Sequence, residues 1–147
     1  MAGQSATGQL TVLRHLNPID GQHPYGTPVV RGSTVYGTTA SGGANNFGTV
    51  YRLASDGSDF TVLHHFGVDA NGTSPTAGLA RRGQTLYGVT AYGGANNAGV
   101  IFRLRLDGSG YALLRHLKEP NGANAYSRLH ATLVGGVWHL YGTTTNG

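Results

Sequence analysis

The chain has no cysteine, one methionine and one lysine among its 147 residues. Without cysteine it has no disulfide, no thiol nucleophile and no zinc site of the cysteine type. Charged residues make up only 11% of the sequence, against about 25% in ordinary soluble proteins. No apolar run approaches about 18 residues, so the sequence predicts no membrane span. Residues 1–9 also lack the apolar core of a signal peptide.

Glycine is abundant, at 25 of the 147 positions, where about 7% is usual. The hydrophobic fraction of 39% is enough for a core and excludes a charged, disordered chain. A glycine-rich, charge-poor composition predicts short strands joined by tight turns and argues against a helical bundle. We therefore expect one all-β domain over residues 10–147, preceded by a flexible lead at residues 1–9.

The net charge of +4 comes from ten basic and six acidic residues. The basic residues are scattered along the chain, and Arg81 and Arg82 form the only adjacent pair. Because a phosphate-binding surface needs clustered Lys and Arg, the sequence predicts no nucleic-acid partner.

The sequence repeats itself. A Tyr-Gly string recurs with its tyrosine at Tyr36, Tyr87 and Tyr141, which gives spacings of 51 and 54 residues. The pentapeptide Gly-Gly-Ala-Asn-Asn occurs at 42–46 and again at 93–97. Several independent strings share this period, and a period near fifty with β-type units is typical of propeller blades.

Each repeat divides into four strand-like runs, rich in Val, Leu, Thr, Tyr and Phe. The expected strands are 29–31, 79–81 and 129–134 for the first run, the three Tyr-Gly strings for the second, 49–53 and 100–104 for the third, and 10–16, 60–66 and 111–117 for the fourth. These eleven strands predict β-propeller blades of four antiparallel strands, about three blades per chain, the last lacking a strand. Because propellers have four to eight blades, either the chain is a piece of a longer propeller or its ring closes by self-association. We expect self-association, most simply as a homodimer with six blades.

The Tyr-Gly-Thr strings, the Gly-Gly-Ala-Asn-Asn loops, the Arg-Leu strings at 52–53 and 103–104 and the Asp-Gly-Ser turns together resemble the GloVer tandem repeat of bacteria. The repeat is also similar to kelch in its period and double glycine, without kelch's usual tryptophan placement. The resemblance implies an extracellular or cell-surface propeller of unassigned activity. It brings no catalytic residue and no cofactor.

Three histidines, His15, His65 and His116, recur once per repeat. They are either a ring of metal ligands or acid–base groups, or half-buried residues that hydrogen-bond a neighbouring strand, such as a threonine hydroxyl. A catalytic residue is needed once and a packing residue in every repeat, so we expect the structural role. The sequence thus predicts no metal site and no catalytic residue. His64 stands where other repeats have arginine, and we expect it to be exposed.

Arg52 and Arg103 also recur in phase. They either grip an anion, or stack on a neighbouring aromatic ring or pair with a turn carboxylate. Asp56 and Asp107 are explained by their Asp-Gly turns.

In this strand order the loops before the first and after the second strand of each repeat emerge on one face. Amide and aromatic side chains on that face suit sugars, although the asparagines could simply satisfy left-handed turns. The candidate ligand-binding residues are Tyr25, Asn45, Asn46, Tyr92, Asn96, Asn97 and Tyr126. We therefore expect a non-enzymatic β-propeller module with a glycan or protein ligand. The alternatives are a glycan-binding lectin and a propeller hydrolase or lyase.

Overall fold

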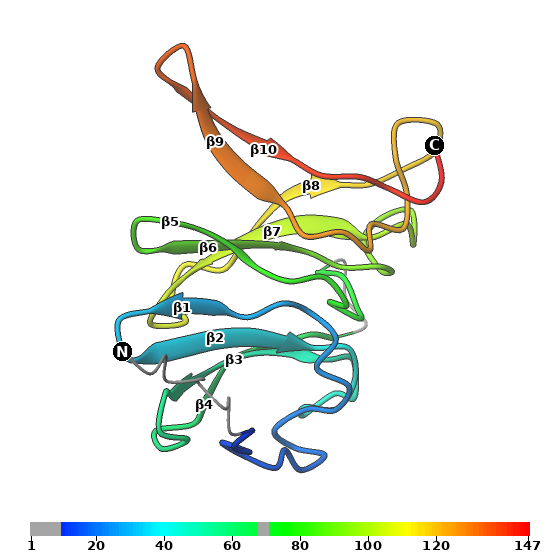
Figure 1. Ribbon diagram of the computed structural model, residues 1–147. Coiled ribbons are helices and arrows are strands. Elements are labelled where there is room, and N and C mark those ends of the chain that lie inside the picture. The colour runs from blue at the N-terminus through cyan, green and yellow to red at the C-terminus, as the bar shows by residue number, and fades with distance from the viewer. Residues whose placement is uncertain (1–9, 68–70) are drawn as a thin grey trace, which may run out of the picture.

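The computed structural model describes residues 10–67 and 71–147, and the flexible lead expected at 1–9 lies outside them. The fold is all-β, with ten strands in three antiparallel sheets and no helix in the described ranges. No helix that could span a membrane is therefore present in this part of the chain. The three sheets follow one another in chain order and lie one above the other (Figure 1).

Strands that are consecutive in sequence are neighbours within each sheet. Sheet I consists of β1 (Val29–Arg31), β2 (Thr34–Thr39), β3 (Thr49–Ala54) and β4 (Thr61–His65). Sheet II consists of β5 (Ala80–Arg82), β6 (Thr85–Val89), β7 (Val100–Arg105) and β8 (Ala112–His116). Sheet III is a hairpin of β9 (His130–Val134) and β10 (Val137–Tyr141). The first two sheets confirm the predicted four-strand unit.

The turns follow from short local signals. In the turn after β3, the carboxylate of Asp56 accepts hydrogen bonds from the backbone nitrogen and the hydroxyl of Ser58, at 2.9 and 2.7 Å. Asp107 and Ser109 repeat both bonds after β7. The turn between β1 and β2 places Gly32 at φ +57°, a conformation that glycine adopts without strain. The predicted role of the two aspartates in Asp-Gly turns is confirmed.

The strand expected at residues 10–16 is absent, so the predicted count of eleven strands is wrong and the described chain has ten. No strand of this part of the molecule lies beside the segment to complete a ladder. The segment instead packs on sheet I, where the Arg14 guanidinium lies 4.2 Å from the centre of the Phe60 ring. His64 makes the corresponding contact with Tyr111 between sheets I and II, at 3.9 Å. The segment thus occupies the place of a preceding sheet's outer strand without being one.

The core lies between the sheets. Between sheets I and II, Val29, Tyr36 and Val50 pack against residues of sheet II that are completely buried. Among these, the Phe102 ring meets the Phe66 ring edge-on at 5.2 Å, a favourable aromatic geometry. Gly88 lies under Phe102 and leaves it room, because a Cβ there would overlap the ring. A second, smaller cluster joins sheets II and III, built on Ala77, Ala80, Val89, Ala98, Leu117, Ala123, Ala125 and Leu129.

Candidate functional site

The loops that carry the predicted ligand-binding residues meet at one end of the sheets, as expected. In the first repeat, the backbones of Gln22 and Ser41 pair with each other through hydrogen bonds of 2.7 and 3.2 Å. In the second, Thr73 and Tyr92 form the same pair. The connection before each first strand is therefore fastened to the loop after the second.

The asparagines of the first loop are tied to backbone atoms. The Oδ1 of Asn46 accepts a hydrogen bond from the backbone nitrogen of Gly42 at 3.1 Å, which closes the loop on itself. The Nδ2 of Asn45 donates to the carbonyl of Phe66 at 3.0 Å, which fastens the loop to the end of β4. Asn46 also has a φ of +62°, which asparagine tolerates better than most residues.

The second loop repeats this arrangement. Asn97 accepts from the backbone nitrogen of Gly93, and Asn96 donates to the carbonyl of Leu117, both at 3.0 Å. All four candidate asparagines therefore have a structural task, performed identically in two repeats. In the described chain the Oδ1 atoms of Asn45 and Asn96 and the Nδ2 atoms of Asn46 and Asn97 have no hydrogen-bond partner.

Two of the three in-phase histidines, His65 and His116, fasten the same loops, whereas His15 makes no side-chain hydrogen bond within the described chain. The Nδ1 atoms of His65 and His116 accept hydrogen bonds from the backbone nitrogens of Ala44 and Ala95, each at 3.0 Å. The predicted structural hydrogen bond is confirmed for His65 and His116, but its partner is a backbone nitrogen of the loop, and the expected threonine hydroxyl is wrong. A nitrogen occupied in this way is not available to a metal ion. No group of three or more His, Asp or Glu residues suited to one metal occurs within residues 10–67 and 71–147.

His64 is half-buried, so its predicted exposure is wrong. Its ring stacks on Tyr111, with the planes 5° apart, and meets Phe66 edge-on at 4.8 Å. Its Nε2 is buried and has no hydrogen-bond partner in the described structure. Burial, with a smaller contribution from the neighbouring His65, lowers the pKa of His64 to about 4. Burial also raises the pKa of Tyr111 to about 12.

The candidate tyrosines do not form one cluster. The hydroxyls of Tyr92 and Tyr126 lie 2.8 Å apart, and both side chains are nearly half exposed, at 44% and 46%. This hydrogen bond raises the pKa of Tyr126. Tyr25, in the first repeat, stacks instead on His23 at 5.7 Å. Of the three candidate tyrosines, the structure thus brings two together, Tyr92 and Tyr126, between the second and third repeats.

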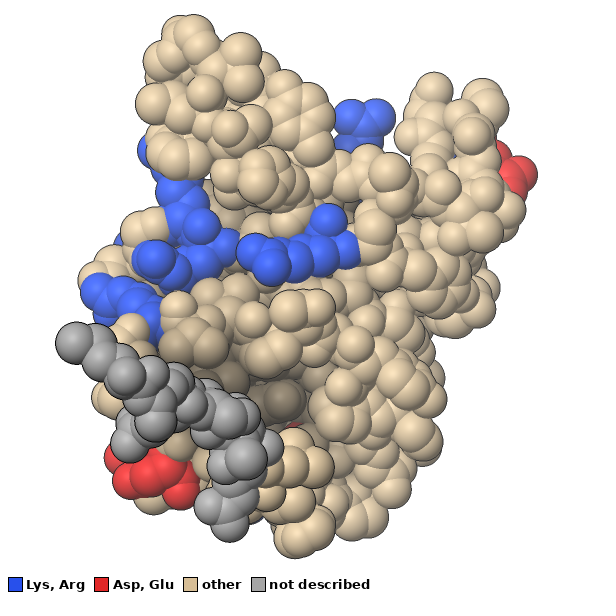
Figure 2. All heavy atoms as spheres, in the orientation of Figure 1, with Lys and Arg blue, Asp and Glu red and all other residues tan. Residues whose placement is uncertain are grey.

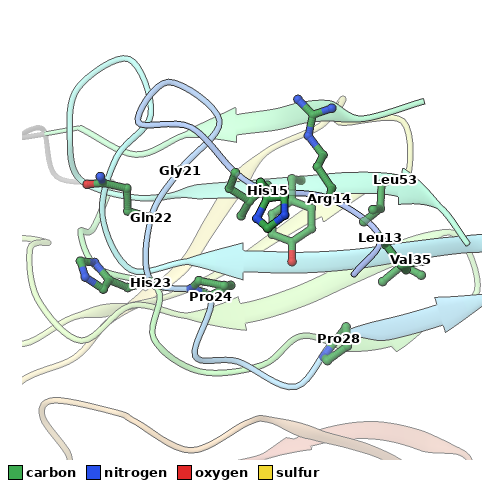
Figure 3. Close-up of a pocket in the computed structure, with 12 residues that line it drawn as sticks. Leu13, Arg14, His15, Gly21, Gln22, His23, Pro24, Pro28, Val35 and Leu53 are labelled. Carbon is green, nitrogen blue, oxygen red and sulfur yellow. The ribbon is translucent and has the colours of Figure 1, made fainter. Parts of the chain in front are cut away.

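A cavity of about 470 Å³ lies between the 10–16 segment and sheet I (Figure 3). Val35 and Leu53 line one side, and Leu13 and His15 line the other. The positions in sheet II that correspond to Val35, Tyr51 and Leu53 are Leu86, Phe102 and Leu104, which are buried under sheet I. The cavity therefore lies on the face of sheet I that corresponds to the face of sheet II packed against sheet I.

The family model described as the Gloeobacter/Verrucomicrobia repeat matches residues 3–147. The chain belongs to this repeat family. Comparison with curated proteins and with solved structures gave no match. The predicted family is thereby confirmed. The family match includes the 10–16 segment, which is consistent with its packing as part of a repeat although it is not a strand.

The sequence analysis did not identify the cavity, and of the arginines at the opposite end of the sheets it singled out as recurring only Arg52 and Arg103, without their neighbours Arg31, Arg82 and Arg105. Arg31 and Arg82 recur 51 residues apart, as Arg52 and Arg103 do. This common spacing could have revealed these arginine pairs in the sequence, because it places the two members of each pair at equivalent strand positions of sheets I and II.

Proposed function

We propose that this chain of the Gloeobacter/Verrucomicrobia repeat family is a non-enzymatic β-propeller module whose sheets are blades and whose open faces bind further blades. The observation that carries the proposal is the repeated junction between sheets. The face of sheet I that bears Val29 and Tyr36 packs on sheet II, and the same face of sheet II packs on sheet III. Such stacking can continue until a ring closes.

The loop chemistry supports a scaffold and not an enzyme. The recurring asparagines and histidines of the loops form hydrogen bonds to backbone atoms in both complete repeats. The two turn carboxylates at Asp56 and Asp107 are occupied by serines. A catalytic centre requires one asymmetric arrangement, whereas these groups serve every repeat alike.

Closure of the ring is tested by the mass in solution. We expect a homodimer, twice the 15.3 kDa of one chain, in which the open face of sheet I is covered. Val35→Arg places a charge on that face, while Thr61→Arg places the same charge at an exposed position of β4. Light scattering should give a monomer for the first variant and a dimer for the second. A folded wild-type monomer at high concentration would contradict self-association.

A second candidate function, binding of neutral glycans at the loop face, is favoured by the exposed pair of Tyr92 and Tyr126. Aromatic rings cover the apolar faces of sugars, and the loop that carries Tyr92 also carries Asn96 and Asn97, whose Oδ1 and Nδ2 atoms respectively have no partner in the described chain. Titration with neutral oligosaccharides, followed by NMR, should weaken with Tyr92→Ala and remain with Tyr25→Ala. Absence of binding by the wild type at millimolar sugar would discard this candidate.

A further inference from the structure

The arginines that are scattered in the sequence are gathered in the fold. The turns after β1, β3, β5 and β7 all lie at the end of the sheets opposite to the loops described above. Exposed arginines stand beside these turns, at 31, 52, 82, 103 and 105. Figure 2 shows a band of basic side chains across the molecule at the level of β5 and β6, with the visible acidic side chains outside it.

A groove of about 680 Å³ runs between sheets I and II at this end. Arg31 and Arg52 line it from sheet I, and Arg105 lines it from sheet II. Because the three guanidinium groups come from three different strands of two packed sheets, their backbones are held in fixed relative positions. Convergent positive charge on a low-dielectric wall concentrates the field in such a groove.

These arginines form no ion pair in the described structure. The only ion pair within residues 10–67 and 71–147 joins Arg14 and Asp20, which lie in the segment before β1 and not in the groove. The groove has one acidic residue, Asp107, whose carboxylate is already bonded to Ser109. Hydrogen bonds from Ser109 lower the pKa of Asp107, and the nearby charge of Arg105 adds a smaller contribution. The sequence allows Arg52 two possible structural roles, stacking on an aromatic ring or pairing with a turn carboxylate. Neither contact of Arg52 is observed in the described residues.

The same arrangement recurs at the next junction. Tyr36 is the direct cross-strand partner of Arg52, and Tyr87 is that of Arg103. A second groove between sheets II and III is lined by Arg82, Tyr87 and Arg103, which correspond to Arg31, Tyr36 and Arg52. There the Arg82 guanidinium is covered by the Trp138 ring at 4.5 Å. The first groove is open and the second is partly capped.

We infer that the groove between sheets I and II binds an anionic polysaccharide, one that carries sulfate or carboxylate groups. Guanidinium groups bind such oxyanions through paired, charge-assisted hydrogen bonds. The groove also holds the Gln84 amide and the Thr85 hydroxyl, which suit sugar hydroxyls. Neighbouring packed sheets are about 10 Å apart, so one extended chain can reach Arg103 in the next groove.

The lining favours a polysaccharide over a nucleic acid. Binding of single-stranded nucleic acid relies on exposed aromatic rings on which bases stack. The only aromatic residue that lines the groove, Tyr36, is 4% exposed and presents no open ring face. The Asp107 carboxylate can accept a hydrogen bond from a sugar hydroxyl but repels a continuous phosphate backbone.

The test uses the full chain and heparin as the sulfated probe, with dextran as the uncharged control and single-stranded DNA as the competing polyanion. Calorimetry at 50 mM salt should show binding to heparin, none to dextran, and weaker binding to DNA. Arg52→Gln should weaken heparin binding about tenfold, the usual effect of losing a hydrogen bond to a charged group.

Arg81→Gln is the matched control, because it removes the same charge from an arginine that donates to its own turn at Gly83. It should change the affinity less than twofold. Equal weakening by Arg52→Gln and Arg81→Gln would show unspecific attraction and overturn the site. No heparin binding, or tighter binding of DNA than of heparin, would overturn the proposed ligand. Neutral-glycan binding at the loop end is measured separately and does not affect these outcomes.

Discussion

Acid should weaken this fold through His64, and the size of the effect can be derived from its surroundings. The imidazole lies between sheets I and II, stacked on Tyr111, with its Nε2 unpartnered. In the unfolded chain His64 takes up a proton near its ordinary pKa of 6.5, whereas in the folded chain it does so only near pH 4. Between these values the unfolded state binds more protons, so stability falls as the pH falls from 6.5 to 4.

The difference between the two pKa values corresponds to at most about 3 kcal/mol. Because the side chain is only half-buried, solvent screens much of this cost, and we expect a loss of about 1 kcal/mol between pH 7.5 and pH 4.5. His64→Phe keeps a ring on Tyr111 and removes the titration. His64→Arg restores the residue found at this position in the other repeats, and its charge does not change over this range.

Urea unfolding of the three proteins at pH 7.5, 6.5, 5.5 and 4.5 measures the effect. The stability of both variants relative to the wild type should rise by about 1 kcal/mol from pH 7.5 to pH 4.5. The contribution of all other titrating groups cancels in this difference. If the difference between wild type and variant stays constant with pH, the assignment of a neutral, buried imidazole is wrong.

Three further substitutions, two of them with a matched control, test the packing and the loop hydrogen bonds. Phe102→Ala should cost about 3–5 kcal/mol in urea unfolding, because the ring is fully buried between two sheets; a loss below about 1 kcal/mol would contradict its central position. His65→Gln should cost about 1 kcal/mol through the loop hydrogen bond, whereas His15→Gln, with no such bond to the described chain, should leave the unfolding curve unchanged. Gly88→Ala should lower the melting temperature, because its Cβ would overlap Phe102, and should do so more than Gly142→Ala, whose Cβ would meet a single leucine methyl group.

The repeat period was enough to predict most of the strands. The prediction of a strand at 29–31 matches β1 at both ends, and 49–53 and 100–104 each fall one residue short of β3 and β7. The alternation of apolar side chains and the Asp-Gly turns are local signals, so they can be read without knowing the neighbouring sheets.

The failure at the first fourth-strand run has a different physical cause. Residues 12–16 read Val-Leu-Arg-His-Leu and residues 113–117 read Leu-Leu-Arg-His-Leu. All but the last residue of the second string lies in β8, and the first string lies in no strand. A strand is defined by the ladder that it forms with its neighbour, and β7 supplies that neighbour only to the second string. Composition and period are nearly equal in the two strings and could not distinguish them.

His64 illustrates the same limit for burial. Whether its ring is covered depends on Tyr111, which lies 47 residues further along the chain and belongs to another sheet. The hydrogen-bond partner of His65 could not be predicted either, because it is a backbone nitrogen, and every residue except proline has one whatever its side chain. Site residues that act through the backbone or across a junction are therefore the ones that sequence reasoning predicts least well.

The loop hydrogen bonds described above stabilise each repeat internally, whereas the apolar contacts stabilise the junctions between repeats. Loop bonds such as Asn45 to Phe66 and His65 to Ala44 lie within one repeat, because they join a loop to the end of a strand of the same sheet. The large apolar side chains, Phe102 above all, are buried between one repeat and the next. In a repeat protein of this kind stability is close to a sum of repeat and junction contributions. The cavity beside Val35 is a junction that no neighbouring sheet of the described chain covers. Its apolar side chains therefore contribute less burial, but the hydrogen bonds of the bordering sheet are unaffected. For this reason the same chain can contain a complete repeat with an open face.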